Sequence, residues 1–196
     1  MNIEQVTALR ILLDAIAVST PNLDVARHAK EIARFITTTP RAWSRATLAG
    51  HITASAWVLD STRTCAALVH HRKLNRWLQP GGHVEDADAT WRAAAQREVT
   101  EETSLAQFIP QTDDATLIDV DVHPIPARAN EPAHFHYDLR FLFVADVDAT
   151  LDRTLLVDLD EVNDCRWFPL AELANDLTIE PSMRRMIELS ICRLFN

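Results

Sequence analysis

Three glutamates near the end of a predicted helix, Glu98, Glu101 and Glu102, are the residues of this chain best suited to chemistry. A helix is predicted from about Thr90 to Thr103, and at about 100° per residue the three glutamates fall on the same face as its small apolar residues. That face should pack against the protein, so we expect the three carboxylates to be turned inward. Carboxylate oxygens are the ligands that Mg²⁺ and Mn²⁺ prefer, which makes this face a predicted site for divalent cations.

The position of these glutamates is electrostatically unfavourable unless a cation is bound. Glu98 and Glu102 are like charges four residues apart, and the negative end of the helix dipole disfavours each glutamate by about 0.3 to 1 kcal/mol. Arg97, four residues before Glu101, offsets only part of this cost. The alternative is an ordinary exposed helix end, but the alanines on the same face argue against it.

A glycine pair upstream, Gly81-Gly82, predicts a tight turn whose backbone can approach a ligand or a metal ion closely. Between Glu85 and Glu102 the chain has six carboxylates and two arginines. Such a site would repel phosphate groups unless a cation mediates the contact.

From Gly82 to Leu105 the sequence resembles the box of the Nudix hydrolase superfamily, G-x5-E-x7-R-E-U-x-E-E-x-G-U, in which U is an aliphatic residue. The run from Arg97 to Thr103 supplies the R-E-U-x-E-E-x positions of that box. Two flanking segments, Trp77–Gly82 and Arg166–Leu170, resemble the family's approach to the box and its late strand-to-helix step.

The match has two departures. The interval from Gly82 to Arg97 is one residue longer than in the pattern, so the first box glutamate falls on Asp88 or on Ala89, depending on the direction of counting. Ser104 replaces the glycine that ends the helix, at a cost of about 1 to 2 kcal/mol if it adopts the left-handed conformation.

The resemblance implies an α+β fold, the Nudix α/β/α sandwich with a mixed sheet, preceded here by an N-terminal helical extension. It implies a pyrophosphohydrolase that uses water to cleave a phosphoanhydride bond in a nucleoside diphosphate linked to another moiety, with Mg²⁺ or Mn²⁺ as cofactor. The implied metal ligands are the carbonyl of Gly81 and the carboxylates of Glu98, Glu101 and Glu102. The same glutamates are the implied catalytic residues, together with Arg97, which would orient them.

A later strand offers candidate substrate contacts. Strict alternation from His134 to Phe143 places His134, His136 and Arg140 on one face, where we expect them to meet substrate phosphate. The alternative is a polar face that is simply exposed to solvent. The His134-x-His136 pair alone is typical of a cupin-like metal site, but the downstream glutamate and glycines of that pattern are absent. The general base stays open among Glu102, Glu131 and His134.

Hydrophobic periodicity indicates the elements that position these residues. Two helices are predicted in the first forty residues, the second from about Leu23 to Ile36, and they form the N-terminal extension over residues 1–42. The Nudix domain is expected over residues 43–196. Strands are predicted near 52–59, 65–70, 116–122, 135–145 and 165–168, and further helices near Pro169 and Pro181. It stays open whether the N-terminal helices cover the substrate cleft or build a homodimer.

Composition limits the function further. The chain has 196 residues and a mass of 22.1 kDa, the size of one domain with an added helical piece. Its three glycines, Gly50, Gly81 and Gly82, cannot form the spaced triplet of a dinucleotide fold or a phosphate-binding loop. A net charge of −9 argues against a nucleic-acid surface, so a small nucleotide or another diphosphate is the expected partner.

The cysteines and the hydropathy bear on location. Cys65, Cys165 and Cys192 are odd in number and widely spaced, which is typical of reduced core thiols. No uncharged apolar run approaches the length of about 18 residues that spans a bilayer, so we expect a cytoplasmic protein without membrane contact.

Two alternative functions stay in view. One is a Nudix-fold nucleotide-binding or regulatory module without turnover, which would be expected to have lost one or more of the three glutamates. The other is the isopentenyl-diphosphate isomerase branch, which needs a reactive cysteine, and Cys65 in its predicted strand is the one candidate near the site.

Overall fold

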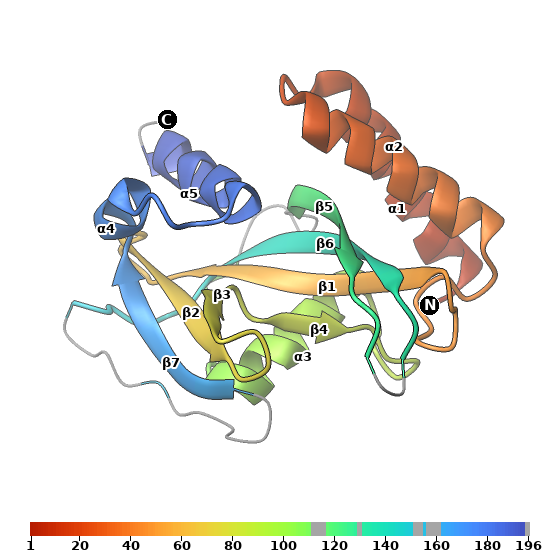
Figure 1. Cartoon of the computed structure of the whole chain (residues 1–196). Coiled ribbons are helices and arrows are strands. Elements are labelled where there is room, and N and C mark those ends of the chain that lie inside the picture. Colours follow the sequence, from red (N-terminus) through yellow and green to blue (C-terminus); the bar gives the residue numbers. More distant parts are fainter. Residues whose placement is uncertain (111–116, 129–130, 151–154, 156–161, 195–196) are drawn as a thin grey trace. The chain divides into compact units, whose positions relative to one another are not determined.

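The computed structural model describes residues 1–110, 117–128, 131–150, 155 and 162–194. Its helices are α1 (Ile3–Ser19), α2 (Leu23–Thr38), α3 (Trp91–Thr103), α4 (Leu170–Asn175) and α5 (Pro181–Leu194) (Figure 1). Its strands are β1 (Gly50–Leu59), β2 (Cys65–His71), β3 (Arg76–Leu78), β4 (Gly81–His83), β5 (Leu117–Ile125), β6 (His134–Val144) and β7 (Val162–Pro169). Thr116, the predicted start of one strand, lies outside the described residues, as does the side chain of Cys192.

The strands form a mixed sheet in the order β3-β2-β1-β6-β5, with β4 paired to β1 and β7 paired to β2. Ala67 in β2 stands opposite Val58 of β1 and opposite Trp167 of β7, in antiparallel register with both. The predicted α+β class is confirmed. β3 and β4 are absent from the prediction, because three residues are too few to show alternation and the glycine pair in β4 predicts a turn.

The chain divides into two compact units whose segments alternate along the sequence. The first unit comprises Met1–Ala54, Gly82–Ala94 and Asp119–Arg140, and the second comprises Ser55–Gly81, Ala95–Ile118 and Phe141–Asn196. Strands β1, β4, β5 and β6 and helix α3 contribute residues to both units.

In the first unit, helices α1 and α2 pack on each other. Asn2 caps α1 in a reciprocal capping box with Gln5, and Asn22 caps α2 through the N–H groups of its first turn. The buried face of α2 includes Ile32, which is fully inaccessible. This helix also contacts strand β6, where the Phe35 ring stacks on Tyr137 with centroids 4.0 Å apart.

The second unit has its own apolar core. Trp57 and Leu68 project from β1 and β2 onto Met186 and Ile187 of α5. The Trp57 indole N–H donates to the Ser190 hydroxyl at 2.6 Å, so the polar atom of this buried ring is satisfied. Within this unit α4 and α5 lie on one face of the sheet and α3 lies on the other (Figure 1).

The expected domain division at residues 42 and 43 stays a prediction. Both N-terminal helices belong to the same compact unit as the segment up to Ala54. Within the described residues, no helix combines the length and the apolar character that crossing a membrane requires.

Candidate active site

Helix α3, which carries the three glutamates, begins at a side-chain cap. The Thr90 hydroxyl accepts a hydrogen bond from the Ala93 N–H at 3.0 Å, which is the N-cap arrangement. The Trp91 indole N–H donates to the Gln5 carbonyl at 3.4 Å, and the Trp91 ring meets Trp43 edge-on at 6.1 Å. The N-terminal extension therefore fixes the start of the glutamate helix.

The loop before this helix contains the extra residue of the box. Asp86 accepts hydrogen bonds from the Arg41 guanidinium at 2.6 Å and from the Trp43 indole at 3.0 Å. Asp88 accepts from the Glu85 N–H at 2.8 Å and closes a turn. Asp88 is one of the two positions where the first box glutamate falls. Its hydrogen bond from the Glu85 N–H stabilises the loop.

Ser104 follows the last residue of the helix and has a φ of 58°. The Ser104 N–H donates to the Thr100 carbonyl at 2.9 Å. Serine therefore adopts the left-handed conformation at the position of the box glycine, the case for which the sequence analysis gives a cost.

Two of the three glutamates are turned inward as predicted. Glu98 is 7% exposed and Glu102 is 6% exposed, and Val99 beside them is fully buried. The Glu101 side chain is 54% exposed, so the prediction of three inward carboxylates is wrong for Glu101. The buried face of the helix is centred nearer to Val99 than the apolar pattern indicates, which leaves Glu101 at its edge.

Arg97 connects the glutamates. One terminal nitrogen of its guanidinium donates to a Glu98 carboxylate oxygen at 3.0 Å and to a Glu101 oxygen at 2.9 Å. Its side chain is 23% exposed, so these bonds lie in a partly desolvated region. A single charge shared between two carboxylates restricts their rotamers and offsets part of their repulsion.

Gly81 contacts the third glutamate through its backbone. The Gly81 N–H donates to Glu102 Oε2 at 3.0 Å. Gly81 has a φ of 155°, and a Cβ built there would lie 2.6 Å from the Ser55 Cα. Only glycine fits this position without displacing backbone, so the close approach of the chain to Glu102 depends on Gly81.

This donor set fits Mg²⁺ or Mn²⁺. Glu98 and Glu102 are buried carboxylates one helical turn apart at the negative end of the helix, a combination that a hard dication stabilises. Burial, followed by the negative charges of Glu102 and Asp164, raises the pKa of the Cys165 thiol to about 12, so this thiol is neutral near pH 7. Cys65 is 4% exposed and lies in β2, as its predicted strand position indicates.

The structure places Arg140 in a buried ion cluster. Arg140 is 2% exposed, and its guanidinium donates to Asp138 and to Asp119 at 2.9 Å each, with Asp121 at 3.4 Å. Thr53 donates to the same Asp138 at 2.9 Å. The polar face of β6 is therefore not solvent-facing at Asp138 and Arg140. A phosphate contact by Arg140 stays a prediction.

His134 and His136 lie in a group of histidine rings that the sequence does not predict. His51 of β1 is 4.8 Å from His136 and 5.0 Å from His134 between ring centroids, and His83 of β4 is 4.9 Å from His51. Burial, followed by the neighbouring histidines, lowers the pKa of His136 to about 2, so its ring is neutral near pH 7. A neutral ring lacks the charge that would attract phosphate, and substrate contacts by His134 and His136 stay predictions.

Of the three candidates for the general base, two lie close to each other. Glu131 Oε1 is 3.9 Å from His134 Nε2, whereas Glu102 is the buried partner of Gly81.

The sequence analysis does not name His51 or His83 as site residues. They lie on different strands from His136, and no spacing along the chain shows that the three rings come together.

Comparisons with known proteins agree with this arrangement. A family model described as the NUDIX domain matches residues 49–189. No curated protein sequence matches the chain.

Several solved structures share its fold. A Nudix-family hydrolase from Clostridium perfringens aligns with a TM-score of 0.51 and 20% identity, over 74% of this chain and 97% of that chain. The MutT protein from Methanosarcina mazei Go1 aligns with a TM-score of 0.50 and 16% identity, over 76% and 99%. The dihydroneopterin triphosphate pyrophosphohydrolase of E. coli aligns with a TM-score of 0.50 and 17% identity, over 72% and 95%. At these identities the likeness shows the fold.

The family model covers most of the chain and includes the helix whose buried glutamates, arginine and glycine contacts are described above. This chain therefore belongs to the Nudix family and is a hydrolase that acts on pyrophosphate bonds.

Proposed function

We propose that this protein cleaves a phosphoanhydride bond in a small nucleotide, a nucleoside diphosphate linked to another moiety, with Mg²⁺ or Mn²⁺ held by Glu98, Glu101 and Glu102. The observation that carries the proposal is the burial of Glu98 and Glu102 at one end of α3, with Glu102 bonded to the Gly81 backbone. Buried carboxylates of this kind are expensive unless a cation compensates them.

Each residue of the site has a role that its contacts support. Glu98 and Glu102 would present oxygens from the buried face, and Glu101 would do so from the exposed edge of the same helix. Arg97 is a positioning residue, because it holds the Glu98 and Glu101 carboxylates at 3.0 and 2.9 Å. The Gly81 N–H restrains Glu102, and its carbonyl is the proposed further ligand.

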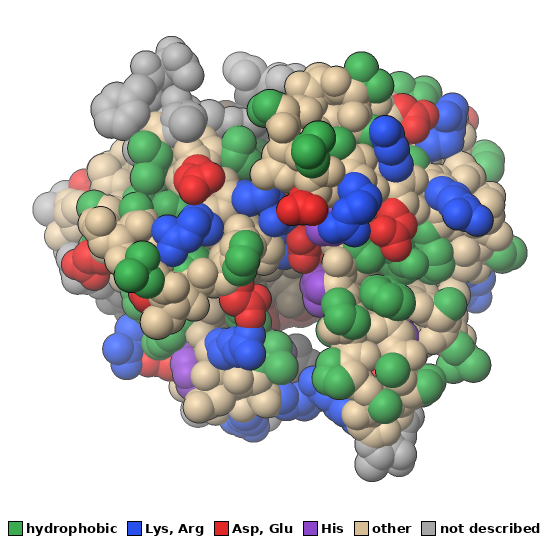
Figure 2. Space-filling model, turned by 45° about the horizontal axis from the view of Figure 1, so that its top comes forward, with side chains coloured by type: hydrophobic (Ala, Val, Ile, Leu, Met, Phe, Trp, Pro, Cys, Tyr) green, Lys and Arg blue, Asp and Glu red, His purple; other side chains and the backbone are tan. Residues whose placement is uncertain are grey.

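The bound ions would neutralise the charge of the diphosphate and lower the pKa of an attacking water. The side chains would supply orientation: a proton acceptor among Glu102, Glu131 and His134 would take the proton of the water. The substrate is proposed as a small molecule, since the net negative charge of the chain disfavours binding of a nucleic acid. On the face drawn in Figure 2, basic side chains are interspersed with acidic ones.

The test measures phosphate release from a panel of substrates with Mg²⁺ or Mn²⁺. The panel contains nucleoside triphosphates, ADP-ribose, dinucleoside polyphosphates, sugar nucleotides and dinucleotide cofactors. A Glu101→Gln, Glu102→Gln double variant should lose at least about 100-fold in kcat/KM, because two carboxylate ligands are removed without a change of shape. Glu188→Gln, an exposed glutamate of α5, is the matched control and should keep the wild-type rate.

The alternative is a Nudix-fold nucleotide-binding or regulatory module without turnover. The presence of all three glutamates, with Arg97 bonded to two of them, favours the enzyme. Nucleotide binding without hydrolysis of any panel member in either metal would support the alternative. Equal rates in the double variant and the wild type would overturn the assignment of the site.

A further inference from the structure

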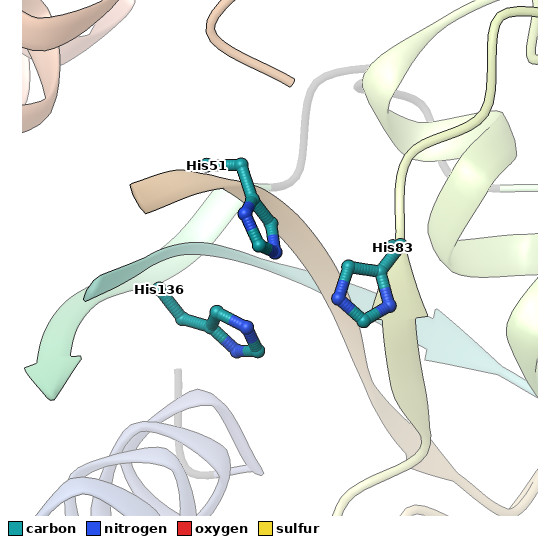
Figure 3. Close-up of side chains that lie close together, drawn as sticks. All are labelled: His51, His83 and His136. Carbon is teal, nitrogen blue, oxygen red and sulfur yellow. The ribbon is translucent and has the colours of Figure 1, made fainter. Parts of the chain in front are cut away.

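Three histidines of the first unit converge on one point. His51 comes from β1, His83 from β4 and His136 from β6, and their rings are turned toward one another (Figure 3). One ligand nitrogen from each ring can be chosen so that the three atoms lie within 4.8 Å of one another. Ring centroids are 4.8 to 5.4 Å apart, and the ring planes are inclined to one another by 38°, 54° and 87°, so parallel stacking does not explain the cluster.

His51 is the least accessible member of the cluster, at 1% exposed. Among the described residues, neither ring nitrogen of His51 has a hydrogen-bond partner. A buried polar group in this state is destabilising, because it has lost its hydrogen bonds to water without a replacement. A ligand that accepts the lone pair of one of these nitrogens would remove that cost.

The protonation state of the rings suits such a ligand. Burial and the neighbouring His134 and Arg45 lower the pKa of His51 to about 4, and burial with the neighbouring histidines lowers that of His136 to about 2. Both rings are therefore neutral near pH 7. Neutral imidazole is the form that binds metal ions, and a cluster of neutral imidazoles has little affinity for anions.

We propose that His51, His83 and His136 form a binding site for a transition-metal dication, Zn²⁺ before others, that differs in its donors from the carboxylate site. Three imidazole nitrogens fill three positions of a tetrahedral zinc ion and leave the fourth for a water. Zinc–nitrogen bonds of about 2.0 to 2.1 Å require nitrogens roughly 3.4 Å apart, so rotation of the side chains from their present spacing closes the site. Imidazole suits zinc, whereas carboxylate and water suit Mg²⁺ and Mn²⁺.

The experiment uses the full chain without an affinity tag, stripped of metal by a chelator and titrated with Zn²⁺ in an excess of Mg²⁺. Calorimetry should show one tight zinc site per chain, and the metal content after desalting should agree. Co²⁺ should give the visible absorption of a tetrahedral complex in the wild type, a readout that needs no substitution.

Variants separate this site from the carboxylates. His136→Asn and His83→Gln, both at partly exposed positions, should each weaken zinc binding by at least about 100-fold. His70→Asn is the matched control, since His70 packs on Trp77 in the second unit and should leave zinc binding unchanged. The Glu101→Gln, Glu102→Gln double variant should bind zinc like the wild type.

The inference fails if the wild type binds no zinc more tightly than Mg²⁺ and gives no tetrahedral cobalt spectrum. It also fails if the histidine variants bind zinc as the wild type does, or if the glutamate double variant is the one that loses it. None of these outcomes depends on phosphate release. The proposal of a zinc site can therefore be wrong while the proposed hydrolase activity is right, and the hydrolase proposal can be wrong while the zinc site is right.

Discussion

Ser104 is the residue at which this chain departs most visibly from the box pattern. With a φ of 58° it occupies the left-handed region that glycine adopts without penalty, and its side chain is exposed. The helix that carries the three glutamates therefore ends in a strained residue. The strain is local, because the Ser104 N–H still donates to Thr100 and closes the last turn.

Ser104→Gly should stabilise the protein. Removing the Cβ relieves the strain of about 1 to 2 kcal/mol, and the greater freedom of glycine in the unfolded chain returns part of it, so the net gain is about 0.5 to 1 kcal/mol. Urea unfolding measures the change. Ser104→Ala is the control and should give no gain, since alanine keeps the Cβ. Equal midpoints for glycine and serine would show that the serine conformation is unstrained.

Helix α3 shows, as an element, what patterns along the chain can and cannot predict. Its limits and its buried glutamates Glu98 and Glu102 follow from periodicity, because both are properties of one segment. The exposure of Glu101 does not, since the apolar pattern fixes the buried face only to a few tens of degrees.

Contacts between distant segments stay beyond such patterns. The aspartates around Arg140 and the cluster of His51 with His83 and His136 arise only when strands pair. The long strands were predictable from alternation, whereas β3 and β4 are too short to show it.

The charges of α3 predict that Glu102→Gln raises the stability of the metal-free protein and lowers the stability that Mg²⁺ adds. Glu102→Gln removes one of two like charges at the negative helix end while the amide oxygen can still accept from the Gly81 N–H. The metal-free variant should therefore be about 0.5 to 1 kcal/mol more stable than the wild type. With Mg²⁺ at 100 times its Kd, the wild type should gain about 2.7 kcal/mol and the variant much less.

Thermal unfolding with and without Mg²⁺ measures both effects. Mg²⁺ is used because imidazole binds it poorly, so the histidine cluster does not contribute. Glu188→Gln should respond like the wild type. A wild type that gains nothing from Mg²⁺, or a variant that gains as much, would remove the argument that these carboxylates bind the ion.

At the scale of the whole molecule, the N-terminal helices contact segments that the family model matches. The domain match begins at residue 49, yet α1 and α2 share a compact unit with later segments. His28 of α2 lies 3.4 Å from Asp121, and Asp121 also approaches Arg140 at 3.4 Å. The extension thus reaches the buried ion cluster of β5 and β6.

A fragment of residues 43–196 should consequently be less stable than the full chain by at least about 3 kcal/mol. It would lose the fully buried Ile32 and Leu13, each worth about 1.5 to 3 kcal/mol, and it would expose Tyr137, on which Phe35 stacks. Urea unfolding of the fragment and the full chain measures the difference. Phe35→Ala in the full chain removes that stacking alone and should give a smaller loss. An unchanged urea midpoint for the fragment would show that the N-terminal helices do not stabilise the rest of the chain. A large decrease in stability would show that they belong to the structure that holds the start of the glutamate helix.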